Sequence, residues 1–252
     1  MTKYNSLRHE YDQGKNYLSF GGGVNSVALM LWLIEHDIEL ESVFVDHGGD
    51  YPETYEYVDM LLTKGYEITV LKPRKIIKGK EVDLYGEYYE YRITPSAHFR
   101  WCTSRWKVLT VANYVEKPCF LFLGIALEEA HRAKRNKEYE FGIVRDYPPI
   151  DHNINRQGCV EIIKRHGLPV PPKSGCFFCP FQKASEIRGL YHRCDDLFGK
   201  ALELEKRNIQ RNKEKGRPQS GYLHASNRPL EVVAMTNQTE LFDDMWPCAC
   251  HD

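Results

Sequence analysis

Apolar residues in the first half of the chain form short continuous runs, separated by longer stretches with a helical period. The short runs are typical of buried strands, and the longer stretches are typical of helices. They predict strands at about 16–20, 41–46, 67–72 and 119–126, and helices at about 24–36, 53–64 and 101–115. Because strands and helices alternate, we predict an α/β fold with a mostly parallel sheet and right-handed crossovers.

The pattern changes beyond this region. A charged stretch follows residue 126, Pro148-Pro149 marks a break, and helices are predicted at about 155–166 and 183–213. We therefore expect an α/β domain at 1–145 and a C-terminal helical, cysteine-bearing portion at 146–252 that packs on it. Residues 73–99 have no clean period and are expected to form a loop or insertion over the site.

Composition narrows the class of protein. The chain has 252 residues, of which 42% are hydrophobic and 12% aromatic, enough for a substantial core. It contains no apolar run of about eighteen residues, and its first residues lack the apolar segment of a signal peptide. The net charge of −1 does not favour nucleic acid or an anionic membrane as a partner. We expect a soluble, cytoplasmic protein.

Three glycines, Gly21, Gly22 and Gly23, stand between the first predicted strand and its helix. Such a turn can cradle an anion, because the first amides of a helix lack partners and the helix dipole favours negative charge. The spacing matches neither GxGxxG nor GxxxxGK[ST], so the turn is neither a Rossmann fingerprint nor a Walker motif. A plain tight turn remains the alternative. Asp46 ends the second strand, at the edge where open α/β sheets bind ligands.

Two segments resemble a known family. The first, SFGGGVNS at 19–26, resembles the PP-loop (SxGGxDS) of the adenine nucleotide alpha-hydrolase superfamily. The second, DHGGDYPETYEY at 46–57, resembles the D-T-G-x-x-F-P-E-T-Y segment of phosphoadenosine phosphosulfate (PAPS) reductases. The resemblance covers about residues 15–182 and implies a flavodoxin-like, doubly wound sheet that binds ATP or PAPS across its strand ends. The implied nucleotide-binding residues are Ser19, Gly21, Gly22, Gly23, Asn25, Ser26, Asp46, Gly124 and Arg132.

The chain departs from the family patterns at two of these places. Asn25 replaces the usual acid and brings no charge to Mg²⁺, which favours binding of an adenylate without its hydrolysis. LGIALEEAHR at 123–132 resembles the family's T-G-I-R-x-x-E-S-x-x-R, in which Gly124 lets the nucleotide approach and Arg132 pairs with a phosphate or sulfate. Ala126 stands where the family often has Arg. The alternatives are a turn role for Asp46 and a solvated helix face for Arg132.

Eight cysteines favour metal or redox chemistry over disulfides in a reducing compartment. Cys176 and Cys179 have the spacing that lets two sulfurs face one metal. RWCTSRWK at 100–107 resembles the C-C-x-x-R-K segment of iron–sulfur sulfonucleotide reductases, with Trp101 replacing one cysteine. The resemblance implies a [4Fe–4S] cluster, for which we expect the ligands Cys102, Cys159, Cys176 and Cys179. Zinc suits four thiolates equally well, free or redox thiols are a further alternative, and Cys194 is the alternative to Cys159.

The C-terminal residues PCACHD carry two more cysteines. Sulfonucleotide reductases have a catalytic cysteine in a C-terminal E-C-G-x-H, which attacks the sulfur of the bound nucleotide. Cys248 or Cys250, near His251, is the candidate for this thiol, although the surrounding Glu and Gly are missing. A frayed tail or a second metal-binding pair is the alternative.

Three functions follow as expectations. The first is a PAPS-reductase-like oxidoreductase with an adenine nucleotide as substrate and a thioredoxin-like protein as electron donor. The second is an ATP-dependent sulfurtransferase that adenylates a nucleic acid and replaces AMP with sulfur. The third is a nucleotide-binding module that has lost its chemistry.

Overall fold

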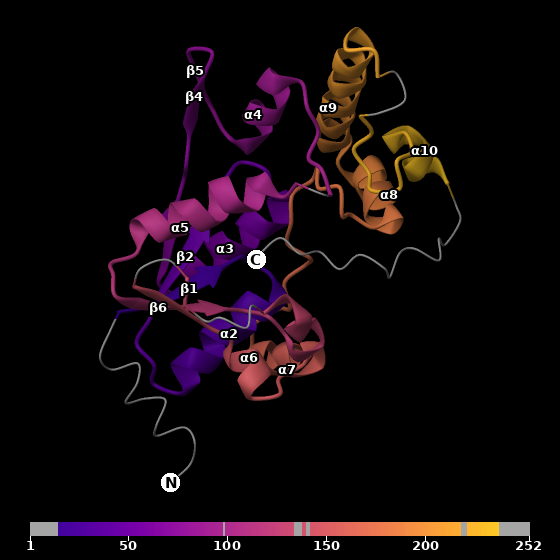
Figure 1. Ribbon diagram of the computed structural model, residues 1–252. Coiled ribbons are helices and arrows are strands. Elements are labelled where there is room, and N and C mark those ends of the chain that lie inside the picture. Colours follow the sequence, from indigo (N-terminus) through magenta and orange to yellow (C-terminus); the bar gives the residue numbers. More distant parts are fainter. Residues whose placement is uncertain (1–14, 98, 134–137, 140–141, 218–220, 237–252) are drawn as a thin grey trace.

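A six-stranded sheet organises the computed structural model, which describes residues 15–97, 99–133, 138–139, 142–217 and 221–236. The strand order within these residues is β3-β2-β1-β6-β8-β7. Figure 1 labels β1, β2 and β6 of this sheet. Five strands run parallel, and β7 joins the edge antiparallel to β8. The bounds are β1 (Lys15–Phe20), β2 (Glu41–Val45), β3 (Ile68–Leu71), β6 (Cys119–Leu123), β7 (Glu138–Tyr139) and β8 (Ile143–Asp146). A separate hairpin joins β4 (Lys75–Ile77) and β5 (Lys80–Val82).

The predicted α/β fold with a doubly wound, mostly parallel sheet is confirmed. One detail differs. Numbered along the chain, the five parallel strands follow the order 3-2-1-4-5, which is the Rossmann arrangement, whereas the flavodoxin order is 2-1-3-4-5. The strand order therefore reverses between β1 and β6. Ligands of open α/β sheets bind outside the carboxyl ends of the strands at this reversal.

Helices cover both faces of the sheet. Side chains alternate between the faces along each strand, so that Leu18 and Phe44 face one core and Tyr17 and Val43 face the other. The helices that cover the first face are α2 (Val24–Glu35), α3 (Pro52–Thr63) and α7 (Arg156–Arg165). The opposite face packs against α5 (Leu109–Tyr114). Two short helices, η2 (Leu127–Arg132) and α6 (Pro148–Asp151), follow β6 and β8.

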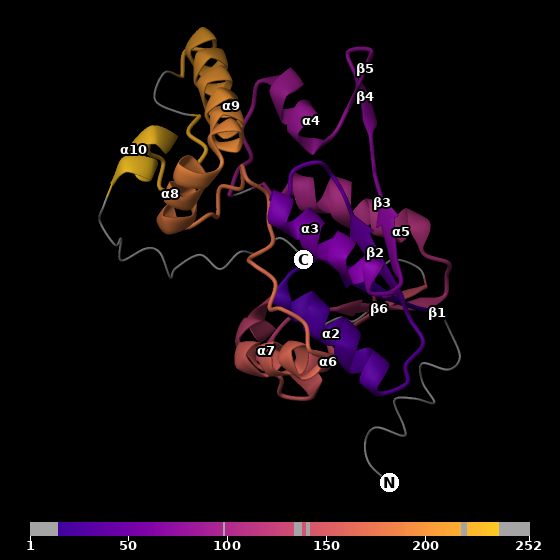
Figure 2. The ribbon, with the colours of Figure 1, turned by 180° about the vertical axis from the view of Figure 1, so that it is seen from behind.

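A second apolar core lies beside the sheet, where a magenta helix meets the orange to yellow helices in Figures 1 and 2. Its elements are α4 (Leu84–Tyr91), η1 (Thr103–Val108), α8 (Ala184–Arg193), α9 (Asp195–Glu214) and α10 (Leu230–Met235). Residues 73–99, expected as a loop or insertion, contain the β4–β5 hairpin and α4. Leu84 and Tyr88 of α4 are buried in this core.

The C-terminal half of the chain contributes to both cores. Ile162 and Ile163 of α7 are buried in the first core, and Leu168 is the last of its residues along the chain. Phe177 is the first residue of the C-terminal segment in the second core. Within the described residues, no helix has the length and apolar character that crossing a membrane requires.

Glu205 gives a test of the second core. It is 2% exposed, and its two carboxylate oxygens accept the backbone N–H groups of Leu223 and Leu230, each at 2.8 Å. We expect Glu205→Ala to lower the free energy of unfolding by about 2–5 kcal/mol, because two buried donors lose their acceptor. Urea denaturation measures the change. The control, Glu203→Ala, alters a half-exposed side chain of the same helix and should shift stability by less than about 0.5 kcal/mol. Equal effects of the two substitutions would contradict the role of Glu205.

Candidate functional site

A cavity of about 530 Å³ lies at the reversal of strand order, beyond the carboxyl ends of β1 and β6. Its volume falls within the range of small-molecule and cofactor sites. One side is formed by Ser19, Gly23, Asn25 and Ser26, and the facing side by Gly124 and η2. Arg156, Lys173 and Lys183 bring positive charge to it from the C-terminal half. The cavity therefore combines a glycine turn with cations at the expected edge of the sheet.

The glycine turn has little room for side chains. Gly22 has a φ of +69°, and a Cβ there would lie 2.9 Å from a methyl group of Thr54. A Cβ on Gly23 would lie 2.5 Å from the Ser174 hydroxyl. Ser26 supports the turn from within, since its hydroxyl donates to the Gly23 carbonyl at 3.0 Å and accepts from the Gly21 amide at 3.2 Å. Gly23 caps α2 without a side chain, so the first amides of the helix are available to an anion.

Gly124 brings the end of β6 against this turn. A Cβ on Gly124 would lie 2.9 Å from the backbone of Asn25 and from the Ser26 nitrogen. Those neighbours are main-chain atoms of a helix start, which cannot move aside as the end of a side chain can. The site thus depends on glycine at both strand ends that form it.

Asn25 is held by two charged side chains. Its amide nitrogen donates to Glu129 at 2.9 Å, and its oxygen accepts from Arg156 at 2.9 Å. Glu129 also binds Arg132 at 2.5 Å. Arg132, expected to pair with a phosphate or sulfate, lines the cavity with a carboxylate as partner. An acid is therefore present beside Asn25, although Asn25 itself is neutral.

Asp46 has the partners of a turn acid. It follows β2, accepts the Gly48 amide at 3.0 Å and lies 3.8 Å from the Lys72 ammonium group. It is not among the residues that line the large cavity. Ser19, in contrast, lines both this cavity and a narrower one of about 50 Å³ on the α5 side of the sheet, where Lys107 and Arg145 also lie.

Three of the four cysteines expected to bind a metal line one small apolar pocket of about 40 Å³. They are Cys102, Cys176 and Cys179. Cys102 precedes the π-helix η1, whose wide turn brings Lys107 to the same pocket. Cys176 and Cys179 lie in a turn closed by a 3.1 Å bond from the Cys179 amide to the Cys176 carbonyl. The hydroxyl of Tyr88 is buried near their thiols, with Cys102 as its nearest thiol partner.

Cys159 is not part of this group. It lies on α7 in the first core, 1% exposed, and burial raises the pKa of its thiol to about 11. Cys194, its alternative, packs against the second core between α8 and α9. The described residues therefore do not supply four thiolates to one [4Fe–4S] cluster, and we derive no step through such a cluster. Cys119 is buried in the core on the α5 side, whereas Cys248 and Cys250 lie outside the described residues.

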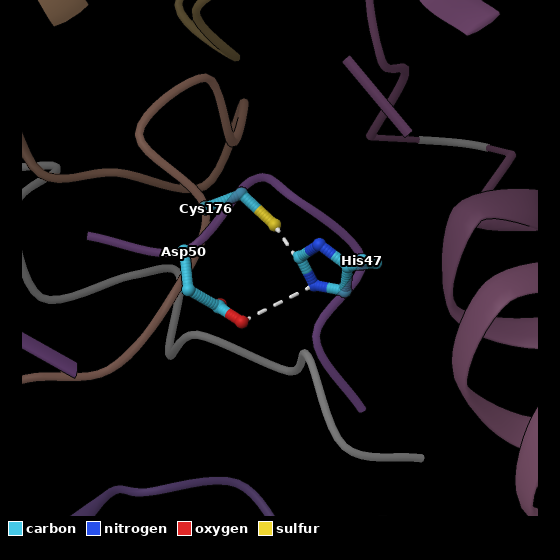
Figure 3. A group of neighbouring side chains, drawn as sticks. All are labelled: His47, Asp50 and Cys176. Atoms are coloured by element: carbon cyan, nitrogen blue, oxygen red, sulfur yellow. Dashed lines mark hydrogen bonds and ion pairs between the residues drawn. The ribbon is translucent and has the colours of Figure 1, made fainter. Parts of the chain in front are cut away.

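Two residues at the site, His47 and Asp50, were not predicted from the sequence. His47 Nε2 lies 3.7 Å from Cys176 Sγ and 3.5 Å from Asp50 Oδ2 (Figure 3). The other Asp50 oxygen lies 4.0 Å from the Lys107 ammonium group. Burial lowers the pKa of His47 to about 4, so its ring is neutral at pH 7. The sequence signal for these two residues was the His-x-x-Asp spacing directly after the second strand. It lies within the segment 46–57 that resembles PAPS reductases.

The two regions of the site share one segment of chain. A further cavity of about 120 Å³ is lined by Cys176 and Cys179, and also by Lys173, Ser174 and Glu186, which line the large cavity. The thiols are therefore reached from the same side as the glycine turn.

Comparisons with known proteins leave the activity open. No family model matches the chain. Two uncharacterised proteins of Methanocaldococcus jannaschii are similar to it. One is 30% identical over 218 residues, which cover 79% of this chain and 50% of that protein. The other is 24% identical over 212 residues, which cover 77% and 42%. The chain thus spans half the length or less of these relatives.

Among solved structures, a phosphoadenylyl-sulfate (PAPS) reductase from Candida auris, in a phosphate complex, matches at a TM-score of 0.47 with 15% identity. The match covers 70% of this chain and 88% of that chain. The fold is assigned from the order and the parallel pairing of the strands in this chain.

Gly124→Ala tests the close approach of β6 to the turn. We expect the variant to lose affinity for inorganic pyrophosphate by tenfold or more, because the added Cβ displaces the amides of Asn25 and Ser26. Calorimetric titration measures the affinity. Gly199→Ala is the matched control, since nothing lies within 4 Å of its added Cβ. The same affinity in both variants would show that the turn tolerates displacement.

Proposed function

We propose that the chain binds an adenine nucleotide in the 530 Å³ cavity and uses it in sulfur chemistry carried by the neighbouring thiols. One observation supports the proposal. The segment Lys173–Cys176 lines the 530 Å³ cavity at one end, and at the other end it lines the small pocket of Cys102, Cys176 and Cys179, here called the thiol pocket. A nucleotide held on the glycine turn would therefore present its phosphoryl or sulfuryl end toward Cys176 and Cys179.

The phosphate end of the ligand is expected at the first amides of α2. Free amides and the helix dipole favour an anion there. Lys173 and Lys183, which also line the cavity, add positive charge. In this structure the Lys173 ammonium group lies 2.6 Å from a carboxylate oxygen of Glu186. An anionic ligand would compete with that carboxylate for the lysine. This arrangement supports an anionic nucleotide over a neutral nucleoside.

The first candidate reaction is reduction of a sulfonucleotide such as PAPS, which the resemblance at 46–57 and the neutral Asn25 favour. A thiolate attacks the sulfur of the sulfuryl group, the bond from sulfur to the phosphate oxygen breaks, and the nucleotide leaves with its electron pair. The thiosulfonate on the enzyme then reacts with a dithiol, which is oxidised to a disulfide as sulfite departs. Cys248 or Cys250, which lie outside the described residues, is the attacking thiol that the resemblance implies, and Cys176 and Cys179 are the thiols beside the cavity that could take the same role. A thioredoxin-like protein is the proposed reductant.

The second candidate is ATP-dependent sulfur transfer to an acceptor such as nucleic acid. Glu129 favours it, because this carboxylate lies 2.9 Å from the Asn25 amide and lines the cavity. A carboxylate at this place can hold Mg²⁺ on the phosphates, which Asn25 cannot do by charge. Adenylation would then release pyrophosphate, and a sulfur nucleophile would displace AMP from the activated acceptor.

Phosphorus NMR distinguishes the two candidates. The protein, purified without oxygen, is incubated with Mg²⁺-ATP and PAPS together in the presence of a dithiol. Conversion of PAPS to adenosine 3′,5′-bisphosphate with ATP unchanged supports reduction, and release of AMP and pyrophosphate supports adenylation. Binding of a nucleotide without turnover would favour a module that has lost its chemistry. Absence of binding would refute the nucleotide site.

Glu129→Gln sharpens the distinction. If Glu129 holds Mg²⁺, we expect AMP release to fall tenfold or more and to respond less to Mg²⁺ concentration, because the amide brings no charge. PAPS reduction, which needs no such ion, should change less than threefold. Glu161→Gln on α7, where the side chain is exposed, is the control. Unchanged ATP turnover in Glu129→Gln would argue against the role of this carboxylate.

A further inference from the structure

We propose that His47, Asp50 and Cys176 bind a single zinc-class metal ion through His47 Nε2, a carboxylate oxygen of Asp50 and Cys176 Sγ. This set of ligands differs from the four cysteines expected from the sequence, with which it shares only Cys176, and it does not depend on the proposed nucleotide. Its three donor atoms lie within 4.8 Å of one another. Figure 3 shows the carboxylate and the thiol converging on the imidazole from two different segments of the chain.

The distance between His47 and Asp50 fits a shared ion better than a hydrogen bond, and the distance between His47 and Cys176 is compatible with either. Zinc bonds of about 2.0 Å to nitrogen and oxygen and about 2.3 Å to sulfur give tetrahedral ligand separations of roughly 3.3 Å for N···O and roughly 3.5 Å for N···S. The observed separations are 3.5 Å from His47 Nε2 to Asp50 and 3.7 Å to Cys176. An effective N–H···O bond to a carboxylate would be shorter than about 3.2 Å.

The arrangement also differs from a proton relay. In a relay the thiol and the carboxylate lie on opposite nitrogens of the imidazole, so that one accepts a proton while the other orients the ring. Here the Cys176 sulfur and the Asp50 oxygen both lie nearest Nε2. Convergence of three donor atoms on one point is the geometry of a common cation.

Charge and burial favour a divalent ion. His47 and Asp50 have side chains 0% and 2% exposed. A neutral imidazole, one thiolate and one carboxylate together carry −2, which a divalent ion balances within the ligand set. The Lys107 ammonium group, 4.0 Å from the other Asp50 oxygen, offsets part of the same negative charge. The mixed set of nitrogen, oxygen and sulfur donors suits Zn²⁺, whereas iron–sulfur clusters prefer thiolates. The fourth ligand position would face the pocket that Cys102 and Cys179 line.

Metal binding would change one local hydrogen bond. The Gly49 amide points at His47 Nδ1 at 3.1 Å, which places the ring proton on Nε2. When a metal takes Nε2, that proton moves to Nδ1 and the Gly49 amide must turn to another acceptor. Gly48, with a φ of +78°, and Gly49 allow this peptide to rotate where other residues would resist. The amide signal of Gly49 is thus a reporter of ligation.

Metal titration of the whole chain tests the proposal. The protein is stripped with a chelator, and Zn²⁺ binding is measured by competition with a chromophoric chelator. We expect one Zn²⁺ per chain, and a loss of affinity of about a hundredfold or more in His47→Gln and in Asp50→Asn, since even outer-shell changes cost 10–100-fold. His166→Gln and Asp59→Asn, on exposed or half-exposed side chains elsewhere, are the controls and should bind as the parent does.

A second measurement covers variants that fail to fold. X-ray absorption of the Zn²⁺-loaded parent protein should give a mixed shell, with sulfur near 2.3 Å and nitrogen or oxygen near 2.0 Å. Addition of Zn²⁺ to the ¹⁵N-labelled protein should shift the Gly49 amide. A shell of sulfur alone, a Gly49 amide that does not move, or full Zn²⁺ affinity in His47→Gln would overturn the proposal.

Discussion

A short antiparallel pairing between the loop after β2 and the segment before Cys179 determines how the site is built. Asp50 and Cys176 form a backbone bridge, the Phe177 amide donates to the Gly49 carbonyl at 3.0 Å, and the Tyr51 amide donates to the Gly175 carbonyl at 3.2 Å. These bonds join parts of the chain that are more than a hundred residues apart. Because the backbone positions are fixed, the side chains of His47, Asp50 and Cys176 have little freedom in how they meet.

Cys102 and Lys107, which line the small pocket together with Cys176 and Cys179, are positioned by side-chain packing and hydrogen bonds. Trp106 of η1 is fully buried in the second core, and its indole nitrogen donates to Glu87 of α4 at 2.5 Å. Lys75 of the hairpin binds the same carboxylate at 3.0 Å and lies over the Trp106 ring. This network fixes the position of η1, and η1 in turn places Cys102 and Lys107 at the pocket. The hairpin and α4 thus serve the site although neither contains a predicted ligand.

The parts of the fold and site that could be predicted are those encoded locally. Apolar runs and helical periods located the strands, and the glycine turn was recognisable because turn, strand and helix are neighbours in sequence. The order of strands was not recognisable, since it depends on which edge β6 joins. Cys159 could have been assigned to the core, because it shares an i, i+3, i+4 stripe with Ile162 and Ile163. The spacing of His47 and Asp50 is visible in the sequence, but their contact with Cys176 is not, because Cys176 lies more than a hundred residues away.

The segment from Lys173 to Cys176 lines the large cavity at its start and the thiol pocket at its end. Its ends are only three residues apart, so an occupant that displaces this segment at one cavity would also displace its other end. Thermodynamic reciprocity then applies: whatever factor an occupant of the large cavity imposes on binding at Cys176, an occupant at Cys176 imposes in return. Through this stretch of backbone, ligand binding in one cavity would change the ligand affinity of the other, without any movement of the sheet.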